Sequence, residues 1–495
     1  MKHKKIAEAF GEIDQEYIAQ AAGPQKPRWP RFVAAAAAIV VVALLVQLLP
    51  IHRPGTVPII MGASPEDLGR PVEILSPATL NLQNLVAGPE YPKMAQLPVY
   101  ENYENKGLYD QDLSAWYWGQ QAQYDQPANY ADGLDKFWNE SIRQFLSGHE
   151  DNAVCSPVNI YMALAMLAEC AEGHSRQQIL ELFGLSSIEA LRAQAGHMWN
   201  AHYSADGATT LVLGNSLWLD HGFSYKQPAV DTLAKDYFAS VFHGDLGTED
   251  MNGQLQSWIN SQTGGLLQKV TEDLTLDPGT AMALASTIYF SATWESKFSE
   301  GQTFQGIFHG KDADIQTQFL YAEFLSAAYY WGKDFGAVKL NLTGDHAMWL
   351  ILPTEGKTVE DVLVSGEYLQ MCNSHWPQQK QYELHLRLPK FDITGTMDLV
   401  EGLKQLGITD VFDPNKADFG GISDSDLFVS KANHGVRVAV DEEGCVAAGY
   451  TVVELKYGGV FIEEEVLRFT LDQPFLFVVT SRNQLPLFAG VVNTL

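Results

Sequence analysis

The chain has 495 residues, 46% of them hydrophobic and 19% charged, which allows a large buried core and excludes global disorder. Its 32 lysines and arginines against 60 aspartates and glutamates give a formal net charge of −28. This acidity argues against nucleic acid as a partner, because nucleic-acid binders need clustered positive charge. The four cysteines include no Cys-x-x-Cys pair, which argues against a disulfide scaffold and a zinc site.

The N-terminal region predicts a membrane anchor. Residues 32–49 are apolar apart from Gln47, and as a helix they would extend about 27 Å, enough to cross a bilayer core. Positive residues are concentrated in 1–31, so this stub is predicted to be cytoplasmic and the rest of the chain extracellular. No small-x-small cleavage site directly follows the run, which favours a retained single-pass anchor over the alternative, a protein secreted after cleavage.

Residues 50–129 differ in amino-acid composition from the rest of the chain. They are rich in Pro, Gln, Asn and Tyr and show no sustained period of 3.6 or 2. We interpret them as an extracellular spacer whose aromatic part packs on the main domain.

Residues 130–495 are predicted to form one main domain. Helical apolar spacing covers 134–146, and 160–171 is apolar nearly all round, as in a buried helix. Strand-like segments follow at Thr210–Leu219, Met282–Phe290, Ala337–Leu342, Ala347–Leu352, Leu384–Phe391, Val436–Val440 and Phe475–Val479. This pattern indicates an α+β fold with large antiparallel or mixed sheets.

The usual catalytic motifs are missing from the sequence. There is no Gly-x-Ser-x-Gly elbow, His-Glu-x-x-His pair, Walker A loop, or Gly-x-Gly-x-x-Gly opening a helix. We therefore predict no catalytic residues, no cofactor and no metal, and expect a protein that is not an enzyme.

A series of short segments resembles the serpin family and occurs in that family's order. The segments are Asn152–Ile160 with Ala163–Leu167, Gln177–Leu180 with Gly184, Asn215–Trp218, Trp258–Gly265, Thr287–Phe290 with Trp294 and Phe298, Ile351–Pro353, Leu388–Phe391, Leu406–Ile408 with Phe412, Phe428–Lys431 with His434, Asp441–Gly444, Pro474–Phe477 and Leu487–Asn493. The resemblance implies a serpin fold of three β-sheets and about nine helices, with an exposed reactive-centre loop near the C-terminus.

The resemblance also implies a function. A target serine or cysteine endopeptidase cleaves the loop and forms an acyl-enzyme, and the cut loop then inserts into the central sheet and traps the protease. We expect a bacterial, membrane-anchored, monomeric inhibitor of this suicide-substrate type. The alternative is a non-inhibitory module of the same fold that serves binding or adhesion at the cell surface.

The loop sequence meets the requirements of an inserting strand. Residues 444–456 contain no proline, so every backbone N–H can join a sheet ladder. One face carries only small or apolar side chains, as a core-facing strand requires. The hinge and insertion residues are Glu442, Gly444, Cys445, Ala447, Ala448, Gly449 and Thr451. Cys445 is expected to be exposed and open to oxidation, whereas Cys155 and Cys170 are expected to be inert core thiols.

The scissile bond is predicted to lie in a seven-residue stretch. Its residues are Lys456, Tyr457, Gly458, Gly459, Val460, Phe461 and Ile462. They leave trypsin-like, chymotrypsin-like, elastase-like, subtilisin-like and papain-like targets open. Residues 185–200 contain Arg192 as their only Lys or Arg, so no heparin dependence is predicted.

Four residues are expected to control opening of the sheet: Ser156, Asn159, Ser286 and His434. Asn159 stands where the family usually has Ser, and Ser286 stands where it usually has an Asn that pairs with the histidine matching His434. We expect Ser286 to hydrogen-bond His434 directly or through water. Val491 replaces the family's usual Arg.

Overall fold

The computed structural model describes residues 77, 82–272, 274–445 and 465–495. Its α-helices are α4 Lys106–Tyr124, α5 Asp135–Leu146, α6 Pro157–Cys170, α7 Gly173–Leu182, α8 Ile188–His202, α9 Gln227–Asp236, α10 Glu249–Gln262, α11 Gln268–Thr271, α12 Val359–Ser365, α13 Glu367–Asn373 and α14 Val400–Gln405. Its strands are β1 Leu85–Ala87, β2 Ala153–Cys155, β3 Ser204–Ala205, β4 Thr209–Asp220, β5 Ala239–Gly244, β6 Met282–Thr293, β7 Phe304–His309, β8 Asp314–Trp331, β9 Phe335–Leu342, β10 His346–Pro353, β11 Gln379–Pro389, β12 Phe391–Asp398, β13 Ala432–Val440, β14 Gly444–Cys445, β15 Val466–Thr470, β16 Phe475–Thr480 and β17 Pro486–Val492.

The strands of the described residues form two mixed sheets. The first has the order β1-β5-β4-β6-β14-β13-β12, with β3 beside β4. Its β4–β5 and β6–β13 pairs are parallel and its other pairs are antiparallel. The second has the order β15-β11-β8-β9-β10-β16-β17-β2, with β7 beside β8. The predicted α+β class with mixed sheets is confirmed.

The expectation of three sheets is corrected to two hydrogen-bonded sheets among the described residues. The reason is the length of β8, which has 18 residues. Its first part pairs with β7, its middle with β11, and its last three residues with β9. One strand thereby joins hairpins that would otherwise belong to separate sheets. Among the described residues, ten α-helices lie between Asp135 and Gln405, whereas about nine were expected.

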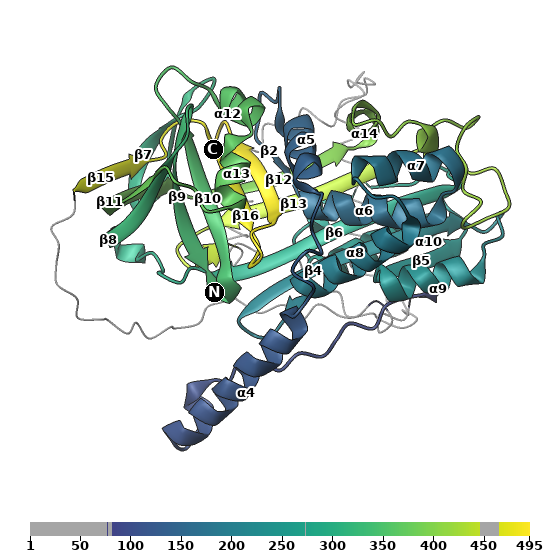
Figure 1. Ribbon diagram of the computed structural model, residues 1–495, viewed down its shortest axis with the longest axis horizontal. Coiled ribbons are helices and arrows are strands. Elements are labelled where there is room, and N and C mark those ends of the chain that lie inside the picture. The colour runs from purple at the N-terminus through teal and green to yellow at the C-terminus, as the bar shows by residue number, and fades with distance from the viewer. Residues whose placement is uncertain (1–76, 78–81, 273, 446–464) are drawn as a thin grey trace, which may run out of the picture. The chain divides into compact units, whose positions relative to one another are not determined.

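The first sheet is covered on both faces. On one face α6, α8 and α9 pack over β4, β5 and β6 (Figure 1). On the other face the α10 residues Leu255 and Trp258 join Trp218, Ala283 and Ala285 in a second apolar cluster. Because strand side chains alternate between faces, residues 283 and 285 of β6 point toward α10 and residue 286 points toward α6.

Helix α6 begins where local chemistry requires it. Ser156 caps it by accepting a hydrogen bond from the Asn159 N–H, and Pro157 occupies the first turn, where a missing N–H costs nothing. Thirteen of its fourteen residues are buried, which explains the run of apolar residues without a polar face.

The segment before residue 130 contacts the main domain through aromatic side chains. The Tyr91 ring lies 5.4 Å from that of Trp199, and its hydroxyl donates to Gln262 at 2.8 Å. Strand β1 pairs with the edge strand β5. The sequence showed no helical period here, yet α4 forms; most of its side chains are exposed, so no apolar stripe marks it.

No helix of the described residues is long and apolar enough to cross a membrane. The predicted anchor at 32–49 and the stub at 1–31 lie outside the described residues.

Candidate functional site

The central feature of the first sheet is a break between β6 and β13. These strands pair in parallel through three residue pairs that end at Ser286–His434. At the other end of the same strands β14 lies between them, with Cys445 opposite both Ala292 of β6 and Val440 of β13. The first two residues of the predicted inserting segment are therefore already a strand of the sheet.

The structure corrects the expectation for Cys445. Its side chain is 1% exposed, and burial raises the pKa of the thiol to about 12. The expectation of an exposed, oxidisable thiol is wrong because Cys445 is already part of the sheet. Gly444 is required here for space, since a Cβ at this position would collide with the Ala292 carbonyl oxygen. The other three cysteines are free and buried, as expected of Cys155 and Cys170.

An ion pair holds Glu442, two residues before β14. The Glu442 carboxylate accepts from Lys390 Nζ at 2.8 Å and from the Thr303 hydroxyl at 2.8 Å. Burial raises the pKa of Glu442, but the Lys390 and Thr303 hydrogen bonds outweigh it, so the pKa lies below its usual value. The next residue, Glu443, pairs with Lys297 near the surface.

Backbone contacts fix the same turn. The Asp441 carboxylate accepts from the N–H groups of Glu443 and Gly444, at 2.9 and 3.1 Å. The indole N–H of Trp294 donates to the Asp441 carbonyl at 2.9 Å. Trp294 and Lys390 belong to segments that carry the family resemblance, but pairing them with 441–442 required the structure.

The four residues expected to control sheet opening lie together. Ser156, Asn159, Ser286 and His434 are all at most 8% exposed. The Ser156 N–H donates to His434 Nε2 at 3.0 Å, which joins α6 to β13. The Ser286 hydroxyl lies 2.6 Å from the Asn159 side-chain amide, which joins α6 to β6.

Among the described residues Ser286 makes no direct hydrogen bond to His434 and contacts other groups instead. Ser286 reaches Asn159 and, at 3.3 Å, Asn215, and its short side chain points toward α6. The amide on the helix and the hydroxyl on the strand thus form the pair that bridges α6 and β6. In the family pattern the helix usually carries the Ser and the strand the Asn, whereas here Asn159 is on the helix and Ser286 is on the strand. The two side chains still make an amide–hydroxyl contact.

His434 is held neutral in this environment. Burial lowers its pKa to about 4. Because Nε2 accepts from the Ser156 N–H, the proton of the neutral ring belongs on Nδ1.

The rest of the predicted loop lies outside the described residues. This applies to Ala447, Ala448, Gly449 and Thr451 and to the whole scissile stretch, 456–462. The chain is described again from residue 465, and β15 pairs in parallel with β11, for example Val466 with Glu383. Strands β14 and β15 thereby hold the two ends of the loop in different sheets.

Two other charged groups of the main domain have local partners. Arg192, the only Lys or Arg of 185–200, donates two hydrogen bonds to Glu169, at 2.7 and 3.1 Å. Asp220, His221 and Asp245 gather at the ends of the parallel strands β4 and β5, with potential ligand atoms within 4.8 Å of one another. His221 pairs with Asp245, and Asp220 accepts from two backbone N–H groups. We assign this exposed group no role.

The sheet and its break define a class of protein: an α+β protein whose first sheet holds the short strand β14 between β6 and β13 at one end only. Comparison with known proteins identifies the family. The family model described as serpin (serine protease inhibitor) matches residues 133–495. Alpha-1-antiproteinase 2 of Equus caballus is 30% identical over 352 residues, which cover 69% of this chain and 81% of that protein. The chain belongs to the serpin family, whose members are generally protease inhibitors.

Other relatives agree with this assignment. Serpin-ZX of Arabidopsis thaliana is 27% identical over 371 residues, covering 69% of this chain and 91% of that protein. The native-state structure of the thermophilic serpin Tengpin has a TM-score of 0.67 at 24% identity, covering 75% of this chain and 95% of that one. The latter likeness supports the fold.

The Glu442–Lys390 pair generates a first prediction. Glu442→Gln should lower the free energy of unfolding by about 1.5–3 kcal/mol, because it weakens partly buried charge-assisted hydrogen bonds. Glu443→Gln is the matched control and should cost under about 1 kcal/mol, since the Glu443 side chain is 43% exposed against 13% for Glu442. Denaturant unfolding followed by tryptophan fluorescence measures both. Equal losses in the two variants would contradict the role given to Glu442.

The buried histidine generates a second prediction. An unfolded histidine titrates near pH 6.5, whereas folded His434 has a pKa of about 4, so between these values the unfolded state binds more protons. Stability should therefore fall as the pH drops from about 6.5 to 4, by up to about 3 kcal/mol from this residue. His202, with a pKa of about 4, and His346, at about 3, add slopes of the same sign. His434→Gln should flatten the profile in part, and a surface control, His149→Gln, should not.

Proposed function

We propose that this serpin is an extracytoplasmic suicide-substrate inhibitor of a serine or cysteine endopeptidase. The observation that carries the proposal is β14: the sheet has already admitted Gly444 and Cys445 between β6 and β13. A cleaved loop would continue this strand into the break, where it would find partner strands on both sides. Family membership adds support, because serpins are generally protease inhibitors.

The register of β14 determines how the strand would continue. Gly444 faces Thr293 and Cys445 faces Ala292, so each further loop residue takes the next position along β6. Ala447 would lie opposite Phe290 of β6 and Val438 of β13, on the core side with Cys445. The five core-side residues that follow Cys445 are Ala447, Gly449, Thr451, Val453 and Leu455. The first four are small or β-branched, and none of the five is charged. This composition suits insertion, since core-facing positions exclude charge and excess bulk.

Insertion would release folding energy that is unavailable while the loop is intact. Each added ladder hydrogen bond contributes roughly 0.5–1.5 kcal/mol, and burial of an apolar side chain such as Val453 or Leu455 roughly 1.5–3 kcal/mol. Over about a dozen residues the sum exceeds ten kcal/mol, enough to hold a bound protease.

A hinge substitution tests this mechanism. Ala447→Glu would place a carboxylate on the core face, so the loop should be cut without trapping the protease. Ala448→Glu is the matched control, because the residue 448 side chain would point to the other face of the sheet, opposite Arg437 of β13. Incubation of the full chain with a panel of serine and cysteine proteases should give an SDS-stable complex for the unaltered protein and for Ala448→Glu. Ala447→Glu should raise the inhibitor consumed per protease by about tenfold or more.

The outcomes separate the two candidate functions. Clean cleavage of the unaltered protein by every protease, with no covalent complex and no gain in thermal stability, would overturn inhibition and favour the non-inhibitory binding or adhesion role. Loss of the complex in both hinge variants alike would contradict the register on which the design depends.

We also propose that the domain stands outside the membrane of a bacterial cell, anchored by 32–49. The apolar run and the cations that precede it support this arrangement. Full-length protein should remain with the membrane fraction after a high-salt wash, and protease added to intact cells should reach residues 130–495. Replacement of Val41 and Leu45 by arginine should lower the membrane-bound fraction. Recovery of the unaltered protein in the soluble fraction would contradict anchoring.

A further inference from the structure

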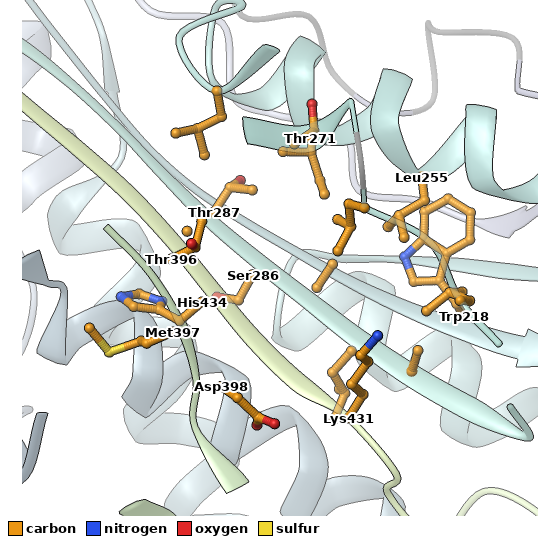
Figure 2. A pocket seen from close by; sticks show the side chains of 18 residues that line it. Trp218, Leu255, Thr271, Ser286, Thr287, Thr396, Met397, Asp398, Lys431 and His434 are labelled. Atoms are coloured by element: carbon orange, nitrogen blue, oxygen red, sulfur yellow. The ribbon is translucent and has the colours of Figure 1, made fainter. Parts of the chain in front are cut away.

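A cavity of about 340 Å³ lies between the first sheet and the cover formed by α10, α11 and the chain that follows them (Figure 2). Its volume falls within the range of small-molecule sites, about 300–1,000 Å³. All of its lining residues belong to the described part of the chain, and none belongs to β14. The cavity can therefore be considered without the reactive loop.

The cavity exists because small residues on the sheet lie under larger side chains of the cover. Its floor includes Ala283 and Ala285 of β6 and Gly435 of β13. Its cover is aliphatic and includes Leu255, Ile259, Leu267, Leu274 and Leu276. The three floor residues carry no side-chain atom beyond Cβ, so the cover does not meet the floor and an apolar space remains between them.

The cavity is elongated along the strands. Its lining includes every residue of 283–287 on β6, a stretch of about 13 Å at about 3.3 Å per residue. In Figure 2 Trp218 and Lys431 lie toward one end, and Thr287 and Thr396 lie toward the other. This shape suits a narrow, extended molecule.

A cation lies at one end of this apolar space. Lys431 is the only Lys or Arg in the lining, and it makes no ion pair among the described residues. Its Nζ lies 3.5 Å from the carbonyl oxygen of Thr275, which belongs to the cover segment. The one carboxylate of the lining, Asp398, already accepts a hydrogen bond from the Val400 N–H at 2.9 Å. A carboxylate on a ligand would therefore find Lys431 available.

A second polar group of the lining also lacks a partner. Thr287 is 2% exposed, and its hydroxyl makes no hydrogen bond among the described residues. By contrast, the hydroxyl of Thr271 in the cover donates to the Gln268 carbonyl at 3.1 Å. Buried polar groups without a protein partner are rare and generally meet a water or a ligand atom. The Thr287 hydroxyl is thus a second indication, independent of Lys431, that the cavity accepts a ligand.

We propose that this cavity binds an elongated apolar carboxylate of the medium-chain fatty acid type. The carboxylate pairs with Lys431, and the chain lies along β6 between the alanine floor and the aliphatic cover. The apolar contacts supply affinity for the chain, and the cation sets its direction. Binding requires neither cleavage nor movement of the reactive loop, so the site is independent of the inhibitory function.

Calorimetric titration of the full chain with decanoate tests the site, with decanol as the neutral probe of similar shape. Decanoate should bind at a single site and about fivefold more tightly than decanol. Lys431→Met should remove this difference, whereas Lys416→Met, which lies outside the lining, should preserve it. Equal affinities for the two probes in the unaltered chain would overturn the assignment of a carboxylate ligand, and absence of binding by either would overturn the site.

Filling the cavity tests its location. Ala285→Leu places a larger side chain on the floor and should weaken decanoate binding by about tenfold or more. Ala193→Leu, at an exposed position of α8, is the control and should leave the affinity unchanged. Unchanged affinity in a folded Ala285→Leu variant would show that decanoate binds elsewhere.

Quenching of tryptophan fluorescence by bromine locates the ligand even if the filled variant does not fold. In α-bromodecanoate the bromine is next to the carboxylate and should lie close to Trp218, whereas in ω-bromodecanoate it lies at the far end of the chain. The α probe should quench more fluorescence than the ω probe, and Trp218→Phe should remove the difference. Equal quenching by the two probes in the unaltered chain would overturn the direction assigned to the ligand.

Discussion

The structure depends on one constraint, the need of buried backbone N–H and carbonyl groups for partners in a sheet. Strands β6 and β13 satisfy it together at one end, through Ser286–His434, and with the help of β14 at the other. No strand of the described residues lies between the stretches 287–291 and 435–439. A further strand of the right composition would complete the ladder, so the requirements on the loop follow from the break: no proline, no charge toward the core, and glycine where β14 passes the Ala292 carbonyl.

The N-terminus of α6 couples the two strands at the point where their pairing ends. Ser156 is the residue that caps the helix, and Asn159 lies in its first turn. One contacts His434 of β13 and the other contacts Ser286 of β6. Separation of the strands past this pair must therefore stretch or exchange a contact made by the same helical turn. Each such buried contact is worth only about 0.5–1.5 kcal/mol net, which a growing strand can compensate with its own hydrogen bonds.

Periodicity located most of the central elements because burial determines their composition. The expected strand at 282–290 is β6, the expected strand at 210–219 is β4, and the buried helix expected at 160–171 is α6. The run at 384–391 was predicted as one strand, but it is divided at Lys390 between β11 and β12, because the chain passes there from one sheet to the other. Helix α4 was missed because exposed side chains leave no periodic signal.

The errors within the site share a cause. A side chain's partner depends on contacts distant in the chain, which composition does not encode. Cys445 was expected to be exposed, since its segment resembles a loop, but the described structure places it between β6 and β13. Ser286 was expected to reach His434, its neighbour in the ladder, but the hydroxyl on that strand points at the amide of Asn159. The family resemblance identified the four residues that lie together at this point of the sheet, but it did not identify which of them are hydrogen-bonded to one another.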